Sequence, residues 1–198
     1  MATRNTYLEL GIDTSELDRA RKLLSGIPWG AEKATYRALN KAARRANTRT
    51  VQSICKSYNI RPGAVRAKLT LSLATRYKFN AQLGLRGSPL ELMKFAVTPK
   101  KPPSQKGKRP EARTQTVAGV RFGTRHVLPH AFVARMKNGH VGIYSRRQER
   151  RAIRQRYTTS VPQMMASITV MPEIMEEAQR VMAAEFDRQI ELLLSQRR

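Results

Sequence analysis

The chain has 198 residues, of which 40% are hydrophobic, and it carries 38 Lys or Arg against 14 Asp or Glu, a formal net charge of +24 at pH 7. This length and composition suit a single folded domain over residues 1–198 and exclude a disordered chain or two large domains. A net charge this far from zero favours a polyanionic partner, with nucleic acid the leading candidate.

The first elements are a short strand and two helices. Alternating apolar residues in "TYLELGID" predict the strand, and "DTSEL" offers capping residues for a helix to about Leu24. The longest helical pattern runs from Pro28 to about Tyr58. Most side chains of its predicted buried stripe are small, which would allow another element to pack close to the helix. The stripe consists of Leu39, Ala42, Ala43, Ala46, Ile54 and Tyr58.

Basic residues recur every four positions along the same helix, at Lys33, Arg37, Lys41, Arg45 and Arg49. This spacing predicts a slowly winding basic ridge. No acidic residues are interleaved to pair with it, so the ridge is either a solvated face or a contact surface.

The middle of the chain changes from helix to strand. Pro62 suits the first turn of a further, shorter helix ending near Leu69. Strict alternation in "RYKFNAQLGL", residues 76–85, predicts a strand with one buried face, and "ELMKFAV" predicts the next strand. Residues 99–114, "PKKPPSQKGKRPEART", combine proline with positive charge and predict a mobile basic loop.

The remaining elements complete an α+β fold. "QTVAGVRF" and "HAFVARM" predict strands, and Asn138 and Gly139 suit a type I′ hairpin turn into "HVGIYS". Together these patterns predict an antiparallel sheet of about four or five strands, packed by the long N-terminal helix and by a C-terminal helix over residues 172–196. "RRQERRAIRQRY" between them is expected to be a basic loop or a short helix outside the core.

Positive charge is concentrated in the middle of the chain. Residues 100–156 hold 16 Lys or Arg against two acids, a net charge of +14, whereas residues 157–198 hold four against six, a net charge of −2. We therefore expect the contacts with DNA or a partner to involve the following basic residues: Lys100, Lys101, Lys106, Lys108, Arg109, Arg146, Arg147, Arg150, Arg151, Arg154 and Arg156.

Catalytic and metal-binding patterns are missing from the sequence. No carboxylate pair lies near a histidine, and no phosphate-binding glycine motif or nucleophile motif with its partners occurs. His126, His130 and His140 lack a further ligand to complete a metal shell. The single Cys55 excludes a disulfide framework and is expected to be a small, buried or half-buried helix residue. We expect no enzyme activity, no cofactor and no metal.

Targeting signals are missing as well. The N-terminus has no apolar segment of the kind found in signal peptides, and no apolar run reaches the roughly 18 residues of a membrane span. We expect no contact with a membrane.

The stretch "LPHAFVARMKNGHVGIYSRR" resembles the minor tail protein Z family of tailed bacteriophages, the lambda-like tail completion proteins. The resemblance is carried by a Pro-x-Ala-Phe strand, a Lys-Asn-Gly turn and a following strand that ends in arginine: Pro129, Ala131, Phe132, Lys137, Asn138, Gly139, Arg146 and Arg147. Looser matches extend over most of the chain, but "TYLELGID" and "RRQERRAIRQRY" are not features that match the family pattern.

This resemblance implies a structural virion protein at the head-proximal end of the tail, assembled in the host cytoplasm, that completes the tail and prepares it for joining the head. It implies a ring, with a homo-hexamer expected. The implied partners are tail terminator and tail tube proteins, the head-tail connector, the tape measure protein and the backbone of DNA in the lumen. The arginines could instead bind acidic surfaces of neighbouring neck proteins.

Two other functions remain open from the sequence. One is a nucleic-acid-binding protein of the ribosomal or nucleoid type, which the composition supports but which lacks aromatic stacking platforms. The other is an enzyme acting on nucleic acid, whose acidic or metal-binding residues are not visible in the sequence.

Overall fold

The structure is a computed structural model that describes residues 4–102, 115–146 and 153–196. Its described helices are α1 (Thr14–Leu23), α2 (Gly30–Ser57), α3 (Pro62–Arg66), α4 (Val161–Met165), α5 (Val170–Ser195) and a 3-10 turn, η1 (Leu92–Lys94). The strands are β1 (Arg4–Leu10), β2 (Leu69–Ser72), β3 (Ala81–Gly87), β4 (Ala96–Thr98), β5 (Thr116–Gly119), β6 (His126–Leu128), β7 (Ala131–Arg135), β8 (Val141–Arg146) and β9 (Ile153–Gln155).

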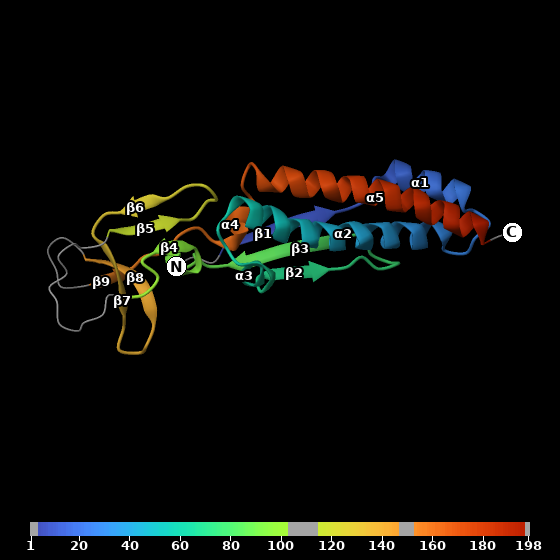
Figure 1. Cartoon of the computed structure of the whole chain (residues 1–198). Coiled ribbons are helices and arrows are strands. Elements are labelled where there is room, and N and C mark those ends of the chain that lie inside the picture. The colour runs from blue at the N-terminus through green and yellow to red at the C-terminus, as the bar shows by residue number, and fades with distance from the viewer. Residues whose placement is uncertain (1–3, 103–114, 147–152, 197–198) are drawn as a thin grey trace.

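The molecule is elongated and has two parts (Figure 1). The helical body contains α1 to α5 and the sheet β1-β3-β2, and α2 and α5 run along its length. The basic lobe, defined as the described residues between 91 and 157, lies at one end and contains the sheets β4-β5-β6 and β7-β8-β9. The C-terminus of the chain lies at the opposite end of the body.

The body is built on the close approach of α2 and α5. Ala34, Ala38, Ala42, Ala43 and Ala46 of α2 are completely buried, and their small side chains allow α5 to pack close to the helix backbone. α5 contributes Ile174 and Ala178 to the same core as the sheet, and Phe186, Ile190 and Leu193 to a second cluster with α1. The apolar stripe predicted for α2 is confirmed.

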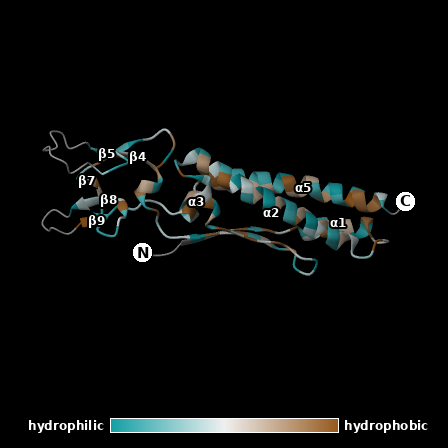
Figure 2. Cartoon of the chain, turned by 60° about the horizontal axis from the view of Figure 1, so that its bottom comes forward, coloured by the Kyte–Doolittle hydropathy of each residue, from teal (hydrophilic) through white to brown (hydrophobic). Residues whose placement is uncertain are grey.

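Alternate side chains of the sheet β1-β3-β2 point toward these helices. β1 pairs with β3 antiparallel, so that Leu8 lies opposite Leu83 and Leu10 opposite Ala81. All four side chains are buried, and Figure 2 shows brown apolar positions along the strands that run beside the helices. The other face is polar, as expected for an antiparallel sheet with one side in water.

The expected single sheet of four or five strands is not what the structure contains, because its described strands form three antiparallel sheets of three strands each. The sequence analysis does not include β2, because this alternating stretch of only four residues begins at Leu69, where the preceding helix was expected to end. The strand predicted over residues 76–85 begins only at Ala81, because Thr75 and Lys78 close a tight turn through mutual backbone hydrogen bonds of 3.0 and 3.3 Å. Tyr77 at its tip is 81% exposed instead of buried.

Two other local predictions differ from the structure. "ELMKFAV" forms η1 followed by the three-residue β4, so only its last part is strand. Ile153–Gln155, within the stretch expected to be a loop or helix, pairs with β8 as β9. In both cases a neighbouring strand supplies the hydrogen bonds that the local sequence does not specify.

The lobe is attached to the body at two places. The chain enters the lobe after Leu90 and re-enters the body at Thr158. These two crossing segments lie side by side, and the Thr158 amide donates a hydrogen bond to the Leu90 carbonyl oxygen over 2.8 Å. At the end of α2, the Asn59 side-chain amide donates to the carbonyl oxygens of Gly119 and Arg121 at 3.0 and 2.9 Å. Asn59 therefore fixes the β5–β6 region of the lobe against the end of α2.

Candidate functional site

The basic lobe is the most strongly charged part of the structure. Its described residues include one acid, Glu91, against ten cations: Lys94, Lys100, Lys101, Arg121, Arg125, Arg135, Lys137, Arg146, Arg154 and Arg156. Within the described part of the chain, none of these ten forms an ion pair, whereas Glu91 lies 3.6 Å from the ring of His140. The lobe therefore presents nearly uncompensated positive charge.

Five of the eleven predicted contact residues lie in the described part of this lobe. Lys100 and Lys101 follow β4, Arg146 ends β8, and Arg154 and Arg156 lie in or just after β9; all five are exposed. The other six, Lys106, Lys108, Arg109, Arg147, Arg150 and Arg151, lie outside the described residues. Residues 103–114 of the expected basic loop also lie outside them.

Arg146 is held against an aromatic pair. Its guanidinium carbon lies 5.7 Å from the centre of the Phe132 ring, a cation–π geometry. Phe132 in turn packs against Tyr144, its partner across β7 and β8, with ring centres 6.4 Å apart. This arrangement limits the conformations of Arg146 while leaving it exposed.

The hairpin predicted around Asn138 and Gly139 exists, but its turn is not type I′. The Met136 amide donates to the His140 carbonyl oxygen over 2.8 Å, which leaves three residues in the loop. Only Gly139 has a positive φ, of +81°, whereas a type I′ turn needs positive φ at two residues. The geometry is that of a three-residue loop ending in a left-handed glycine, and Asn138 Oδ1 accepts a hydrogen bond from the His140 amide at 3.1 Å.

The basic ridge of α2 lies beside α5. Arg45 and Arg49 form ion pairs with Glu177 and Glu173 at 2.6 and 3.2 Å. Arg37 donates a hydrogen bond to Gln189 at 3.2 Å. Lys33 is half-buried and Lys41 is exposed. The acids that pair with the ridge come from a helix more than 120 residues away in the chain, so the ridge is in part an internal contact between helices.

Two carboxylates of α5 near its contact with α2, Glu177 and Glu185, are stabilised in their charged form. Hydrogen bonds from Arg45 and Arg180 lower the pKa of Glu177. Hydrogen bonding from Arg188 lowers the pKa of Glu185 to about 2, with a further hydrogen bond from Gln189 and the nearby charge of Lys41 acting in the same direction. Both acids remain charged at neutral pH. Glu177 joins α5 to α2 through Arg45, whereas the hydrogen bonds of Glu185 lie within α5.

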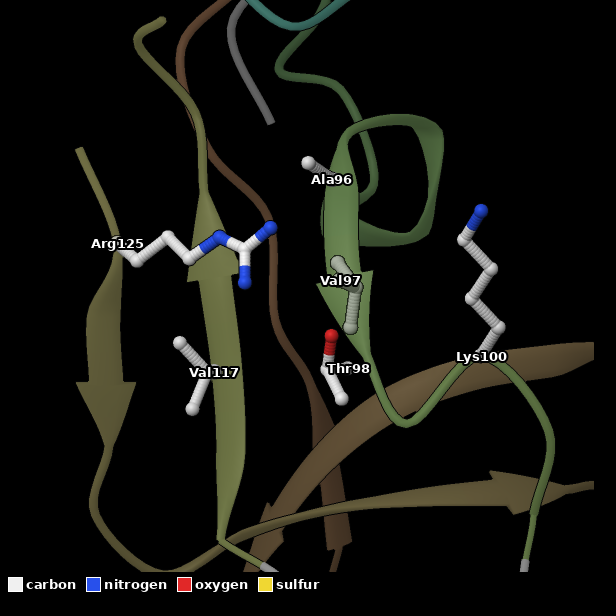
Figure 3. Close-up of a pocket in the computed structure, with 6 residues that line it drawn as sticks. All are labelled: Ala96, Val97, Thr98, Lys100, Val117 and Arg125. Carbon is white, nitrogen blue, oxygen red and sulfur yellow. The ribbon is translucent and has the colours of Figure 1, made fainter. Parts of the chain in front are cut away.

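Sequence reasoning missed a shallow hollow on the lobe, drawn in Figure 3. It has a volume of about 150 Å³ and is lined by Ala96, Val97, Thr98, Lys100, Val117 and Arg125. Of these, only Lys100 is among the predicted contacts. Nothing in the local sequence around Thr98 or Arg125 signals the hollow, because β4 to β6 bring the residues together by strand pairing.

The described residues contain no group of three or more His, Cys, Asp or Glu side chains placed to hold a metal ion. Cys55 is half-buried on α2, as expected, and burial raises the pKa of its thiol. None of the described helices is long and apolar enough to cross a membrane.

The family model of the prophage minor tail protein Z (GPZ) matches residues 16–197, nearly the whole chain. The chain belongs to this family. The resemblance found in the sequence is thereby confirmed, and the minor tail protein Z family makes the chain a structural protein of a phage tail. A structural tail protein is consistent with the expectation of no catalysis. No curated protein and no solved structure matches the chain significantly.

Proposed function

We propose that this tail protein acts at the head-proximal end of the tail, where it completes the tail and prepares it for joining to the head. It assembles there as a ring, a homo-hexamer, whose partners are the tail terminator and tail tube proteins, the head-tail connector and the tape measure protein. The family supports a structural role among tail proteins, and the elongated shape supports separate contacts at the two ends of each copy.

The basic lobe faces the DNA path in this proposal. The observation that carries it is the charge of the lobe, where ten described cations stand against one acid that already faces a histidine. A chain of phosphates is the polyanion that such a surface attracts without reading sequence. The helical body, with its long α2–α5 pair, is then left for contacts with neighbouring copies and tail proteins.

A phage lacking the protein tests the position in the tail. The expected result is tails of full length that do not join heads, and that become competent when the purified protein is added. Short or missing tails would contradict the proposal, because they would place the protein in initiation or tube growth.

Mass determination by light scattering tests the ring. We expect a hexamer in solution, or a monomer that forms a ring only on isolated tail ends, at both low and high salt. A monomer that ignores tail ends would contradict this part of the proposal.

DNA binding is tested by the slope of log affinity against log salt. Replacing Arg150, Arg151, Arg154 and Arg156 with Gln should weaken binding and flatten the slope together, by about 0.9 for each phosphate that the protein no longer neutralises. An unchanged slope, combined with weaker binding to an acidic tail or neck protein, would assign these arginines to protein contacts.

A further inference from the structure

The outward face of the sheet β4-β5-β6 combines small apolar side chains with two cations. Strand register places Thr98, Val117 and Val127 side by side across the three strands. The neighbouring row contains Ala96 opposite Gly119. Val97, between Ala96 and Thr98, points the other way and is buried in the lobe core. The side chains at the centre of this face are therefore small.

Gly119 lies in close contact with the backbone of Thr124 and with the side chains of Asn59 and Arg125. A Cβ at residue 119 would lie 2.6 Å from the carbonyl oxygen of Thr124 and 3.5 Å from Arg125 Cγ, so no larger residue fits without displacing the neighbouring backbone. Figure 3 shows the side chain of Arg125 extending across β5 toward β4. Arg125 is thus an exposed residue whose side chain lies over the sheet.

Lys100 and Thr98 complete the hollow. In Figure 3 Lys100 flanks β4 on the side opposite Arg125, with Thr98 between them. Among the described residues that line this hollow of about 150 Å³, two are cations and none is an acid. The side chains of Arg125 and Lys100 form no hydrogen bond or ion pair with any other residue in the described ranges. Within those ranges, their donors are not engaged by another residue.

We propose that this hollow binds one phosphate group of a nucleic-acid backbone, with Arg125 and Lys100 neutralising its charge and the Thr98 hydroxyl donating a further hydrogen bond. A guanidinium, an ammonium and a hydroxyl all donate to oxygen, as a phosphodiester requires. At about 30 Å³ for each water molecule, the hollow has room for several waters, enough for a phosphate that displaces them.

The same lining accounts for binding without sequence preference. Ala96 and Val117 offer apolar contact to the carbon atoms of a sugar, and none of the six lining residues is an aromatic side chain on which a base could stack. A phosphate contact positions the backbone and carries no base information. This site rests on the proposed function, in which the lobe faces DNA, and assigns that contact to particular atoms.

The test uses the full-length protein and a DNA duplex of random sequence, with binding followed by fluorescence anisotropy over a series of salt concentrations. Arg125→Gln and Lys100→Gln should each weaken binding by roughly tenfold at low salt and flatten the salt slope by about 0.9. Arg135→Gln and Lys94→Gln are the matched controls, because they remove the same charges from exposed positions of the same lobe that do not line the hollow. The controls should change affinity much less.

A third variant, Ala96→Glu, keeps both cations and places a carboxylate within the hollow. It should weaken binding in the same way, because the new acid competes with the phosphate for Arg125. Circular dichroism and thermal unfolding of each variant separate weaker binding from a failure to fold, and Lys100→Gln, at an exposed position, keeps the test available if Arg125→Gln unfolds the lobe.

The outcomes are distinguishable. If the wild-type protein shows no salt-dependent DNA binding, both the lobe's role and this site are overturned. If it binds DNA but the hollow variants behave like their controls, the proposed function stands and the phosphate site is overturned. If the hollow variants no longer bind a purified neighbouring tail protein while keeping DNA affinity, the hollow binds a protein carboxylate and the phosphate assignment is again overturned.

Discussion

Arg45 on α2 donates a hydrogen bond from Nε to Oε1 of Glu177 on α5 over 2.6 Å, joining residues 132 positions apart in the chain. Glu177 also accepts two hydrogen bonds from Arg180, and four residues further along α2 Arg49 pairs with Glu173. Because the helices are antiparallel, these contacts fit only one register of α5 along α2.

We expect Arg45 and Glu177 to be energetically coupled. Arg45→Glu alone should lower thermal stability, since it places two acids together, and adding Glu177→Arg should recover much of the loss. Thermal unfolding of both single variants and the exchanged pair measures this. If the exchange recovers nothing, the contact does not help set the register.

Ala42 of α2 is completely buried in the main hydrophobic core. Ala42→Leu should lower the free energy of unfolding by about 1–3 kcal/mol, because the added methylenes force α5 away. Ala184→Leu, the same change at an exposed position of α5, should alter it by less than about 0.5 kcal/mol. Urea unfolding of both variants measures the difference, and equal effects would show that the alanine stripe is not tightly packed.

Asn59 links the lobe to the body through two side-chain hydrogen bonds. Asn59→Ala should cost about 1–3 kcal/mol, because two carbonyl oxygens lose their donor. The backbone amides of residue 59 and Phe122, which bond to Val120 and Ser57, should exchange faster with deuterium. Asn5→Ala, whose side chain accepts one exposed hydrogen bond at 3.4 Å, is the control and should leave these amides unchanged.

Gly139 ends the β7–β8 turn with a φ of +81°. Gly139→Ala should destabilise the lobe by about 1–2 kcal/mol, because an L-residue is strained in the left-handed region. Gly63→Ala is the matched control, since Gly63 lies in α3, does not have a positive φ and has nothing within 4 Å of an added Cβ. That variant should be neutral or more stable by up to about 1 kcal/mol, as measured by chemical unfolding.

The stability of α5 near its contact with α2 should be sensitive to acid. The folded-state pKa of Glu185, about 2, lies below its ordinary value of 4.5, so its stabilising contribution is complete above pH 4.5 and is lost as pH falls toward 2. Glu185→Gln should therefore reduce the loss of stability within this range. Glu176→Gln, an exposed acid of the same helix, should leave the pH profile of wild-type unfolding unchanged.

The helices could be predicted from the sequence because their signals are local. α2 and α5 carry apolar stripes that depend only on spacing within each helix, and Leu39, Ala42, Ile174 and Ala178 are buried as that spacing predicts. The uneven distribution of charge along the chain also follows from the sequence alone. The family resemblance rests on a short turn and two strands and is confirmed over nearly the whole chain.

Which strands pair, and which distant side chains meet, was decided only by the tertiary structure. Strand pairing follows from which edges are free once the helices have packed, so a pattern that predicts one sheet folds as three. The acids that pair with Arg45 and Arg49 lie on a distant helix, and spacing within α2 carries no information about them. For the same reason Thr98, Lys100 and Arg125 meet around one hollow only because β4 to β6 pair in their observed register.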